Sequence, residues 1–176
     1  MAAKPSKKSP VISKKTDAGQ VAPSKPAVLP CPTVGIGASA GGLGALEQLL
    51  GNVPRDSGLG FVVLQHLEPT QRTLMPELLQ RITPMRVIEV KDGVRVPPDC
   101  VYVTPPNKDI SVLRGVLHLL APSEQRGFRL PTDHFFRALA EDQRERSVGV
   151  ILSGMGSDGT LGIRAIKEMG GLVLAQ

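Results

Sequence analysis

Three residues whose types can act together in catalysis, Ser39, His66 and Asp158, each stand shortly after an apolar run of the chain. A serine hydroxyl attacks a carbonyl carbon when a histidine accepts its proton, and a carboxylate beside that histidine holds the imidazole and stabilises its charged form. Such a group hydrolyses esters or amides. Each residue also has a structural interpretation: His66 as a hydrogen-bonded structural histidine, and Asp158 as the N-cap of the helix that follows it.

Ser39 lies in a glycine-rich turn between two expected elements. Residues 34–37 form an apolar run that is too short for a helix, which favours a buried strand. After the turn, four leucines recur at helical spacing and predict a helix: Leu43, Leu46, Leu49 and Leu50. The turn therefore leads from a strand into a helix.

This turn fits more than one functional template. Read from Gly35, it is Gly-x-Gly-x-x-Ala, which is typical of dinucleotide binding at a helix N-terminus. Read from Gly37, it is Gly-x-Ser-x-Gly, a nucleophile elbow that exposes a serine hydroxyl beside backbone N–H groups. A P-loop is excluded because Leu43 stands where that loop needs lysine. A plain glycine-rich turn with an N-capping serine is the structural alternative.

The next apolar run, residues 61–66, predicts a second buried strand that ends in His66. A dinucleotide-binding fold needs an acidic residue at the end of this strand, about 20 residues past the glycines, to bind the ribose hydroxyls. Gln65 and His66 stand at that place, and the nearest acid is Glu68. The sequence therefore disfavours a nucleotide cofactor.

The rest of the chain alternates strands with helices. Strands are expected at 85–90, 100–104, 147–152 and 172–175, with an antiparallel hairpin at 110–113 and 116–119. Three further helices have expected inward residues: Leu74, Leu78 and Ile82 after an N-cap at Thr73; Phe135, Phe136, Leu139 and Ala140 in a helix that starts at Pro131; and Gly162, Ile163, Ile166 and Met169. We predict a doubly wound, mostly parallel sheet with helices on both faces and an appended hairpin.

Such a sheet would bring the three candidate residues together. The carboxyl ends of parallel strands meet at one edge, where these folds place their ligands. Ser39, His66 and Asp158 all follow strands, so we expect them on the same rim, with the backbone N–H groups of Ala40 and Gly41 as oxyanion donors at a helix N-terminus. This placement favours a serine hydrolase.

Other residues that could act as bases or bind metals are not expected to do so. His118 lies on the predicted hairpin, and His134 lies on a helix face with no serine near it, so both are interpreted as structural. Cys31 and Cys100 lack the spacing of a metal site and are expected to be buried thiols rather than a disulfide. The sequence thus predicts neither a metal nor a cofactor.

Positive charge is concentrated at the start of the chain. The net charge is +5, and residues 1–30 hold six lysines and one aspartate, which leaves 15 basic and 15 acidic residues at 31–176. A neutral body with few aromatic rings is a poor nucleic-acid surface. Residues 1–30 lack apolar periodicity and predict a disordered tail. No apolar run is long enough for a secretory signal or a membrane helix, so we expect a cytoplasmic protein.

Four motifs give the chain a family resemblance. They are residues 34–42 (VGIGASAGG), 65–67 (QHL), 101–105 (VYVTP) and 151–159 (ILSGMGSDG). Together they resemble the catalytic domain of the chemotaxis protein-glutamate methylesterases, the CheB family. The resemblance implies a triad of Ser39, His66 and Asp158, with Met155 beside the oxyanion site. It also implies hydrolysis of glutamyl methyl esters on the cytoplasmic domain of methylated chemoreceptors, and deamidation of glutamine.

The sequence departs from the family pattern in specific places. Ala40 stands where members often have threonine, so a hydroxyl contact is lost while the backbone N–H remains. We expect no receiver domain for phosphorylation ahead of the fold. Residues 130–140 resemble the methylesterase half of methylesterase-methyltransferase fusions, which suggests a sensory fusion partner. The family continues beyond the residues that match 172–176, so this segment is expected to be an uncovered strand that favours self-association.

We therefore expect a tail at 1–30 and a methylesterase-type catalytic domain, incomplete at its C-terminus, at 31–176. The alternative hypothesis is a catalytically weak or silent regulatory domain that keeps the fold in a sensory fusion. Labelling of Ser39 by a fluorophosphonate distinguishes the two, because only an activated serine reacts.

Overall fold

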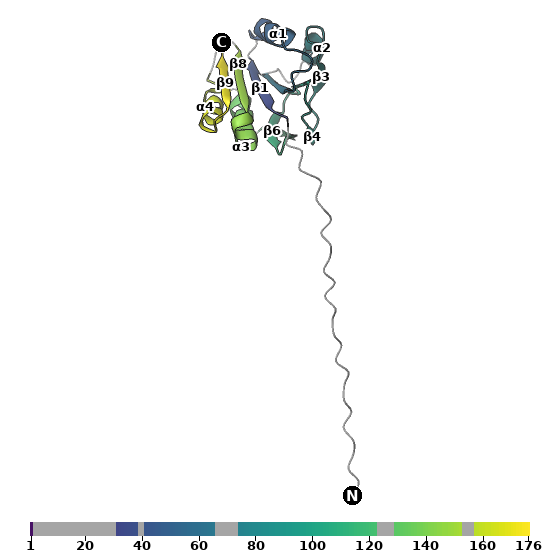
Figure 1. Cartoon of the computed structure of the whole chain (residues 1–176), viewed down its shortest axis with the longest axis vertical. Helices are drawn as coiled ribbons and strands as arrows, with labels where there is room; N and C mark the ends of the chain where they lie inside the picture. The colour runs from purple at the N-terminus through teal and green to yellow at the C-terminus, as the bar shows by residue number, and fades with distance from the viewer. Residues whose placement is uncertain (2–30, 39–40, 66–73, 123–128, 153–156) are drawn as a thin grey trace.

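The computed structural model describes residue 1 and residues 31–38, 41–65, 74–122, 129–152 and 157–176 (Figure 1). The predicted tail therefore lies outside the described residues, apart from Met1. Within the described ranges the chain forms nine strands, four α-helices and one short 3-10 helix. They are β1 Thr33–Ala38, α1 Leu43–Gly51, β2 Gly60–Gln65, α2 Met75–Gln80, β3 Arg86–Glu89, β4 Val94–Arg95, β5 Cys100–Val103, β6 Asp109–Leu113, β7 Val116–Leu120, α3 Pro131–Gln143, η1 Arg144–Arg146, β8 Val148–Leu152, α4 Thr160–Glu168 and β9 Leu172–Ala175.

The strands form two sheets. The larger has six strands in the order β3-β5-β2-β1-β8-β9, and each of its pairs is parallel. The smaller has three antiparallel strands in the order β4-β7-β6. The chain moves outward from β1 on one side through β2 and on the other side through β8, which is the doubly wound arrangement predicted from the alternation of strands and helices.

Helices cover both faces of the large sheet. Leu46 and Leu50 of α1 and Leu79 of α2 join one buried cluster with the alternate strand residues Val34 and Ile36. The opposite cluster contains buried residues of α3, α4 and the small sheet: Phe135, Phe136, Leu139, Ile166, Ile110 and Leu117. In Figure 1, α1 and α2 lie together at the top, and α3 and α4 lie side by side at the other side of the strands. The predicted α/β fold class is confirmed.

Helix α3 lies close to the centre of the sheet because β1 carries glycines on that face. A Cβ atom built on Gly35 would lie 2.7 Å from Cε1 of Phe136, and one built on Gly37 would lie 2.5 Å from Cγ2 of Thr132. Real side chains do not tolerate such distances, so a larger residue would push the helix away. The first turn of α3 therefore packs against the carboxyl-terminal part of β1.

The predicted hairpin is confirmed as β6 and β7, and β4 adds a third strand that the sequence did not reveal. Arg114 and Gly115 connect the hairpin with φ values of 53° and 70°, the left-handed pair of a type I′ turn. Asp142 of α3 accepts hydrogen bonds from both of their backbone N–H groups. A carboxylate near the end of α3 thus holds the turn of the small sheet.

The face predicted for the second helix is right at Ile82, which packs against the core, and wrong at Leu74. Leu74 is 60% exposed, whereas Met75 and Leu79 are buried. The N-cap is Leu74, without a side-chain cap bond, rather than Thr73. Helix α2 has only six residues, so it is too short for its apolar spacing to identify which of two overlapping faces packs inward.

One prediction near the end of the chain is also wrong. Met169 is 43% exposed because α4 ends before it, at Glu168. Residues 172–175 form a strand as expected, and Leu172 and Leu174 are 57% and 48% exposed. Strand β9 is the outermost strand of the described sheet, and of its residues Val173 packs against the core. This exposure agrees with the expectation that the strand is uncovered.

Candidate functional site

Three strand ends meet at the carboxyl edge of the large sheet. Ala38, the last residue of β1, is in register with Gln65 at the end of β2 and with Leu152 at the end of β8. In the sequence, Ser39 follows Ala38 and His66 follows Gln65. Ser39 and His66 themselves lie outside the described residues, as do Ala40 and Met155, so their roles remain predictions. The register therefore places Ala38 and Gln65, the residues before Ser39 and His66, on the same rim.

Asp158 is described, and its carboxylate is held by the backbone of α3. One oxygen accepts a hydrogen bond from the N–H of Thr132 at 3.1 Å, and the other accepts from the N–H of Asp133 at 2.9 Å. Pro131, the first residue of the helix, has no N–H to donate. Asp158 therefore receives the two N–H groups of the first turn that follow the proline, groups that have no acceptor within a helix.

The interpretation of Asp158 as the cap of its own following helix is wrong. The N-cap of α4 is Gly159, which has a φ of 96° and makes no side-chain cap bond. Asp158 instead caps α3, more than 20 residues earlier in the chain. The positive end of the α3 dipole stabilises the negative charge of the carboxylate, and the paired bonds prevent it from rotating. A carboxylate fixed in this way is suited to orient an imidazole.

Gly41 lies in the turn before α1 and is exposed. A Cβ atom on Gly41 would have no atom within 4 Å, so the space beside its backbone is open. The N-cap of α1 is Gly42, and Ser39, the capping residue of the structural alternative, lies outside the described residues. An open backbone at a helix N-terminus agrees with the predicted oxyanion role of Gly41, which stays a prediction.

Two features of this edge were missed from sequence alone. The first is the N-terminus of α3, which supplies the partners of Asp158; Pro131, Thr132 and Asp133 were recognised only as a helix start. The second is Gln65, whose side-chain oxygen is buried and has no hydrogen-bond partner among the residues that the structure describes. Its position beside His66 in the sequence was the available signal.

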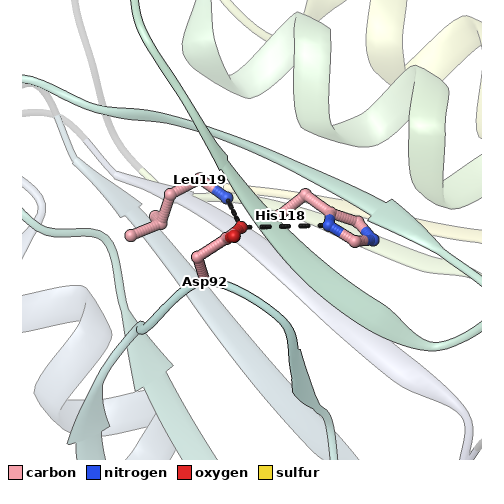
Figure 2. A network of polar contacts seen from close by, with 3 residues as sticks. All are labelled: Asp92, His118 and Leu119. Atoms are coloured by element: carbon pink, nitrogen blue, oxygen red, sulfur yellow. Dashed lines mark hydrogen bonds and ion pairs between the residues drawn. The ribbon is translucent and has the colours of Figure 1, made fainter.

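A second combination of serine, histidine and aspartate occurs on the small sheet. Figure 2 shows Asp92 beside His118, with 3.8 Å between Oδ1 and Nδ1, while the same Oδ1 accepts the N–H of Leu119 at 2.9 Å. Ser111 is opposite His118 in the strand register. The side chains of His118 and Asp92 are 41% and 68% exposed, and no hydrogen bond joins Ser111 to His118 in the described part of the chain. This group lies away from the rim and offers matched controls for it.

The two cysteines are free and half-buried. Cys31 donates its S–H to the carbonyl of Val96 at 3.1 Å. Burial raises the pKa of both the Cys31 and Cys100 thiols above the ordinary value of 9.0. The prediction of thiols rather than a disulfide is confirmed, and no group of three metal-ligating residues occurs among the residues that the structure describes.

Thiol reactivity provides a test of this environment. At pH 8, iodoacetamide should modify both cysteines about tenfold more slowly in the native protein than in urea, because the reactive thiolate is disfavoured by burial. Since the folded-state pKa values lie above 9.0, the contribution of these thiols to stability is full below pH 9 and is lost as the pH rises through the folded values. Mass spectrometry over time measures the rates, and equal rates in the two states would contradict the assignment.

The Asp158→Asn variant tests the anchor of the carboxylate. The new NH₂ group would face a backbone N–H of Thr132 or Asp133, so we expect a loss of about 1–2 kcal/mol in unfolding free energy. Activity on an ester should fall by about 10²–10⁴-fold in kcat, because an amide cannot stabilise an imidazolium. The matched control is Asp92→Asn at the exposed carboxylate of the small sheet, which should change neither quantity. Equal behaviour of the two variants would contradict a special role for Asp158.

Comparisons with known proteins agree with this geometry. A family model described as CheB methylesterase matches residues 34–176. A protein-glutamate methylesterase/protein-glutamine glutaminase of Burkholderia lata is 34% identical over 146 residues, which are 82% of this chain and 44% of that protein. Protein-glutamate methylesterase FrzG of Myxococcus xanthus is 36% identical over 84% of this chain and 44% of its own length.

A solved structure of a CheB methylesterase domain has the same fold. The crystal structure of the Thermotoga maritima CheB methylesterase catalytic domain aligns with a TM-score of 0.73 and 31% identity, and covers 81% of this chain and 78% of that one. The chain spans less than half the length of the curated relatives named above. Among the helices that the structure describes, none is long and apolar enough to cross a membrane.

Proposed function

Because the chain belongs to the CheB methylesterase family over residues 34–176, we propose that it is a serine esterase of chemotaxis signalling. Its substrate is the glutamyl methyl ester of a chemoreceptor cytoplasmic domain, and its products are glutamate and methanol. The protein therefore acts in the cytoplasm.

The proposed reaction runs through an acyl-enzyme. The Ser39 hydroxyl attacks the ester carbonyl while His66 takes its proton, and the resulting oxyanion accepts hydrogen bonds from the N–H groups of Ala40 and Gly41, beside Met155. Collapse breaks the bond to the methoxy group, which leaves as methanol with the proton from His66. Water then attacks the acyl-enzyme with His66 again as base, and glutamate is released. Asp158 stabilises the imidazolium in both halves.

The observation that carries this proposal is the anchored carboxylate at the carboxyl edge. Asp158 accepts two N–H groups of α3, whose first turn packs against β1 through Gly37. β1 ends at the residue before Ser39, in register with the residue before His66. A nucleophile, a base and an orienting carboxylate supplied by adjacent strand ends satisfy the requirements of acyl transfer.

The name of the Burkholderia lata relative also includes a glutaminase. We propose that the same residues deamidate receptor glutamines, because amide hydrolysis differs only in the leaving group: ammonia departs in place of methanol. The same acyl-enzyme would follow, so both activities should depend on Ser39.

Two measurements test the proposal. A fluorophosphonate probe should label Ser39, as located by peptide mass spectrometry, since only an activated serine reacts. Methanol release from the methylated cytoplasmic domain of a chemoreceptor should follow enzyme concentration. A chain that neither reacts with the probe nor releases methanol would refute the esterase assignment.

A further inference from the structure

Asp133, in the first turn of α3, is buried, with 4% of its surface exposed. Its Oδ1 accepts a hydrogen bond from the N–H of Gly162 in the first turn of α4, at 2.6 Å. Its own N–H donates to Asp158, which precedes α4. Asp158 therefore accepts two N–H groups from the first turn of α3, and Asp133 in α3 accepts one N–H group from the first turn of α4. We call this reciprocal arrangement of Asp133 and Asp158 the aspartate clasp.

The two helices approach closely at the clasp. A Cβ atom built on Gly162 would lie 2.5 Å from Cβ of Phe136 and 3.1 Å from Cα of Asp133. One built on Gly159 would lie 2.5 Å from Cδ1 of Ile151 and 3.1 Å from Cγ2 of Thr132. The residue after Asp158 is thus enclosed between β8 and α3, and the start of α4 is enclosed against Asp133. The segment that carries Asp158 can move little while the hydrogen bonds of the clasp are present.

The side chain of Asp133 also retains an unsatisfied atom. Its Oδ2 is buried and has no hydrogen-bond partner within the described ranges of the chain. A buried oxygen without a partner lowers the stability of the fold. The Asp133 carboxylate stays buried despite this cost, with its other oxygen bonded to Gly162. Within a single helix Asp133 would serve only as a favourable first-turn acid, but its carboxylate is directed at the other helix.

We propose that Asp133 is a positioning residue for the reaction: by fixing the N-terminus of α4, it holds Asp158 where Asp158 can orient the catalytic imidazole. This inference rests on the proposed esterase function. Asp133 need not touch the substrate. Its removal changes the position of a carboxylate, and a displacement of about 1 Å in a catalytic group can lower a rate by about 10²-fold.

The test compares Asp133→Ala with Asp142→Ala in the full chain. Asp142 is the matched control, because it is also a carboxylate of α3 that accepts backbone N–H groups, from Arg114 and Gly115, but it holds the hairpin turn. We expect Asp133→Ala to lower kcat for methanol release by about 10–100-fold with KM within about twofold. Asp142→Ala should lower the melting temperature by a similar amount and leave kcat unchanged. Asp133→Asn, which keeps an acceptor oxygen, should restore most of the rate.

Amide hydrogen exchange gives a readout that needs no turnover. The N–H groups of Thr132 and residue 133 donate to Asp158, and the first turn of a helix offers them no acceptor of its own. Their exchange should accelerate by about tenfold or more in Asp133→Ala and stay unchanged in Asp142→Ala. If Asp133→Ala does not fold, Asp133→Ser, whose hydroxyl is one bond shorter, provides the same comparison.

The possible outcomes separate the two claims. Unchanged exchange at Thr132 and residue 133 would overturn the positioning role, and so would an unchanged kcat in a folded Asp133 variant. Failure of Asp133→Asn to recover activity would also count against it. If the wild-type chain shows no hydrolysis that depends on Ser39, the proposed function fails, while the exchange data still report whether Asp133 holds Asp158.

Discussion

The Ser39→Ala and His66→Ala variants are each expected to lose at least about 10⁴-fold in kcat for methanol release. Nucleophile and base act as one unit, so removing either leaves only substrate binding and the oxyanion donors. The loss should appear in kcat rather than in KM, because neither side chain is required to bind the receptor. Steady-state methanol release and labelling by a fluorophosphonate measure the two effects independently, and both variants should fail to react with the probe.

The small sheet provides matched controls for these substitutions. The control variants Ser111→Ala and His118→Ala also remove a serine and a histidine side chain. Ser111 and His118 lie opposite each other in the register of β6 and β7, and His118 is beside the exposed Asp92. Both variants should keep wild-type kcat and probe labelling. If His66→Ala remained folded and active while His118→Ala lost activity, the base would have been assigned to the wrong histidine. Activity retained by Ser39→Ala would refute the nucleophile.

The Phe136→Ala variant is expected to lose about 3–5 kcal/mol in unfolding free energy. Phe136 is fully buried, and its ring and Cβ fill the space left by glycines of three elements. Cβ atoms built on Gly35, Gly149 and Gly162 would lie 2.7, 3.2 and 2.5 Å from it. Its removal opens a cavity where β1, β8 and α4 meet, and these close-packed backbones cannot collapse easily into it.

Urea denaturation monitored by circular dichroism measures this loss. The unfolding free energy of an ordinary domain is about 5–15 kcal/mol. The variant would lose a large part of it, so it should also melt at a markedly lower temperature. Phe136→Leu, which refills most of the volume, should lose less. Leu113→Ala, at a residue that is 61% exposed, is the control and should stay within about 0.5 kcal/mol of wild type. A loss below about 1 kcal/mol for Phe136→Ala would show that the ring is not central to the core.

The architecture was predictable wherever elements were long or bounded by turn residues. Strands at 34–37, 61–66 and 147–152 and the helix that starts at Pro131 were found from apolar runs and periodicity, and Phe135, Phe136, Leu139 and Ala140 are buried as predicted. These signals are local, because burial on one face repeats at the period of the element. The parallel arrangement followed from the alternation of strands with helices.

The errors have the same physical origin. Helix α2 is short enough that two apolar faces were possible, and β4 has only two residues, so neither has a usable period. Strand β9 was expected to be uncovered, and its apolar sequence alone would not have shown this, because exposure depends on which neighbours cover a strand. Position in the sheet is decided by other parts of the chain, and no property of residues 172–175 reports it.

For the candidate site, the sequence by itself determined which residue types follow which strands, and hence the prediction of a serine, a histidine and an aspartate on one rim. Only the tertiary structure decided what holds Asp158. Its partners are 25 and 26 residues away, and Gly162 is 29 residues from Asp133. Backbone N–H groups are common to almost every residue, so no sequence pattern marks the two that a distant carboxylate will receive. The approach of α3 to α4 at glycines selects them, and that approach exists only in the packed molecule.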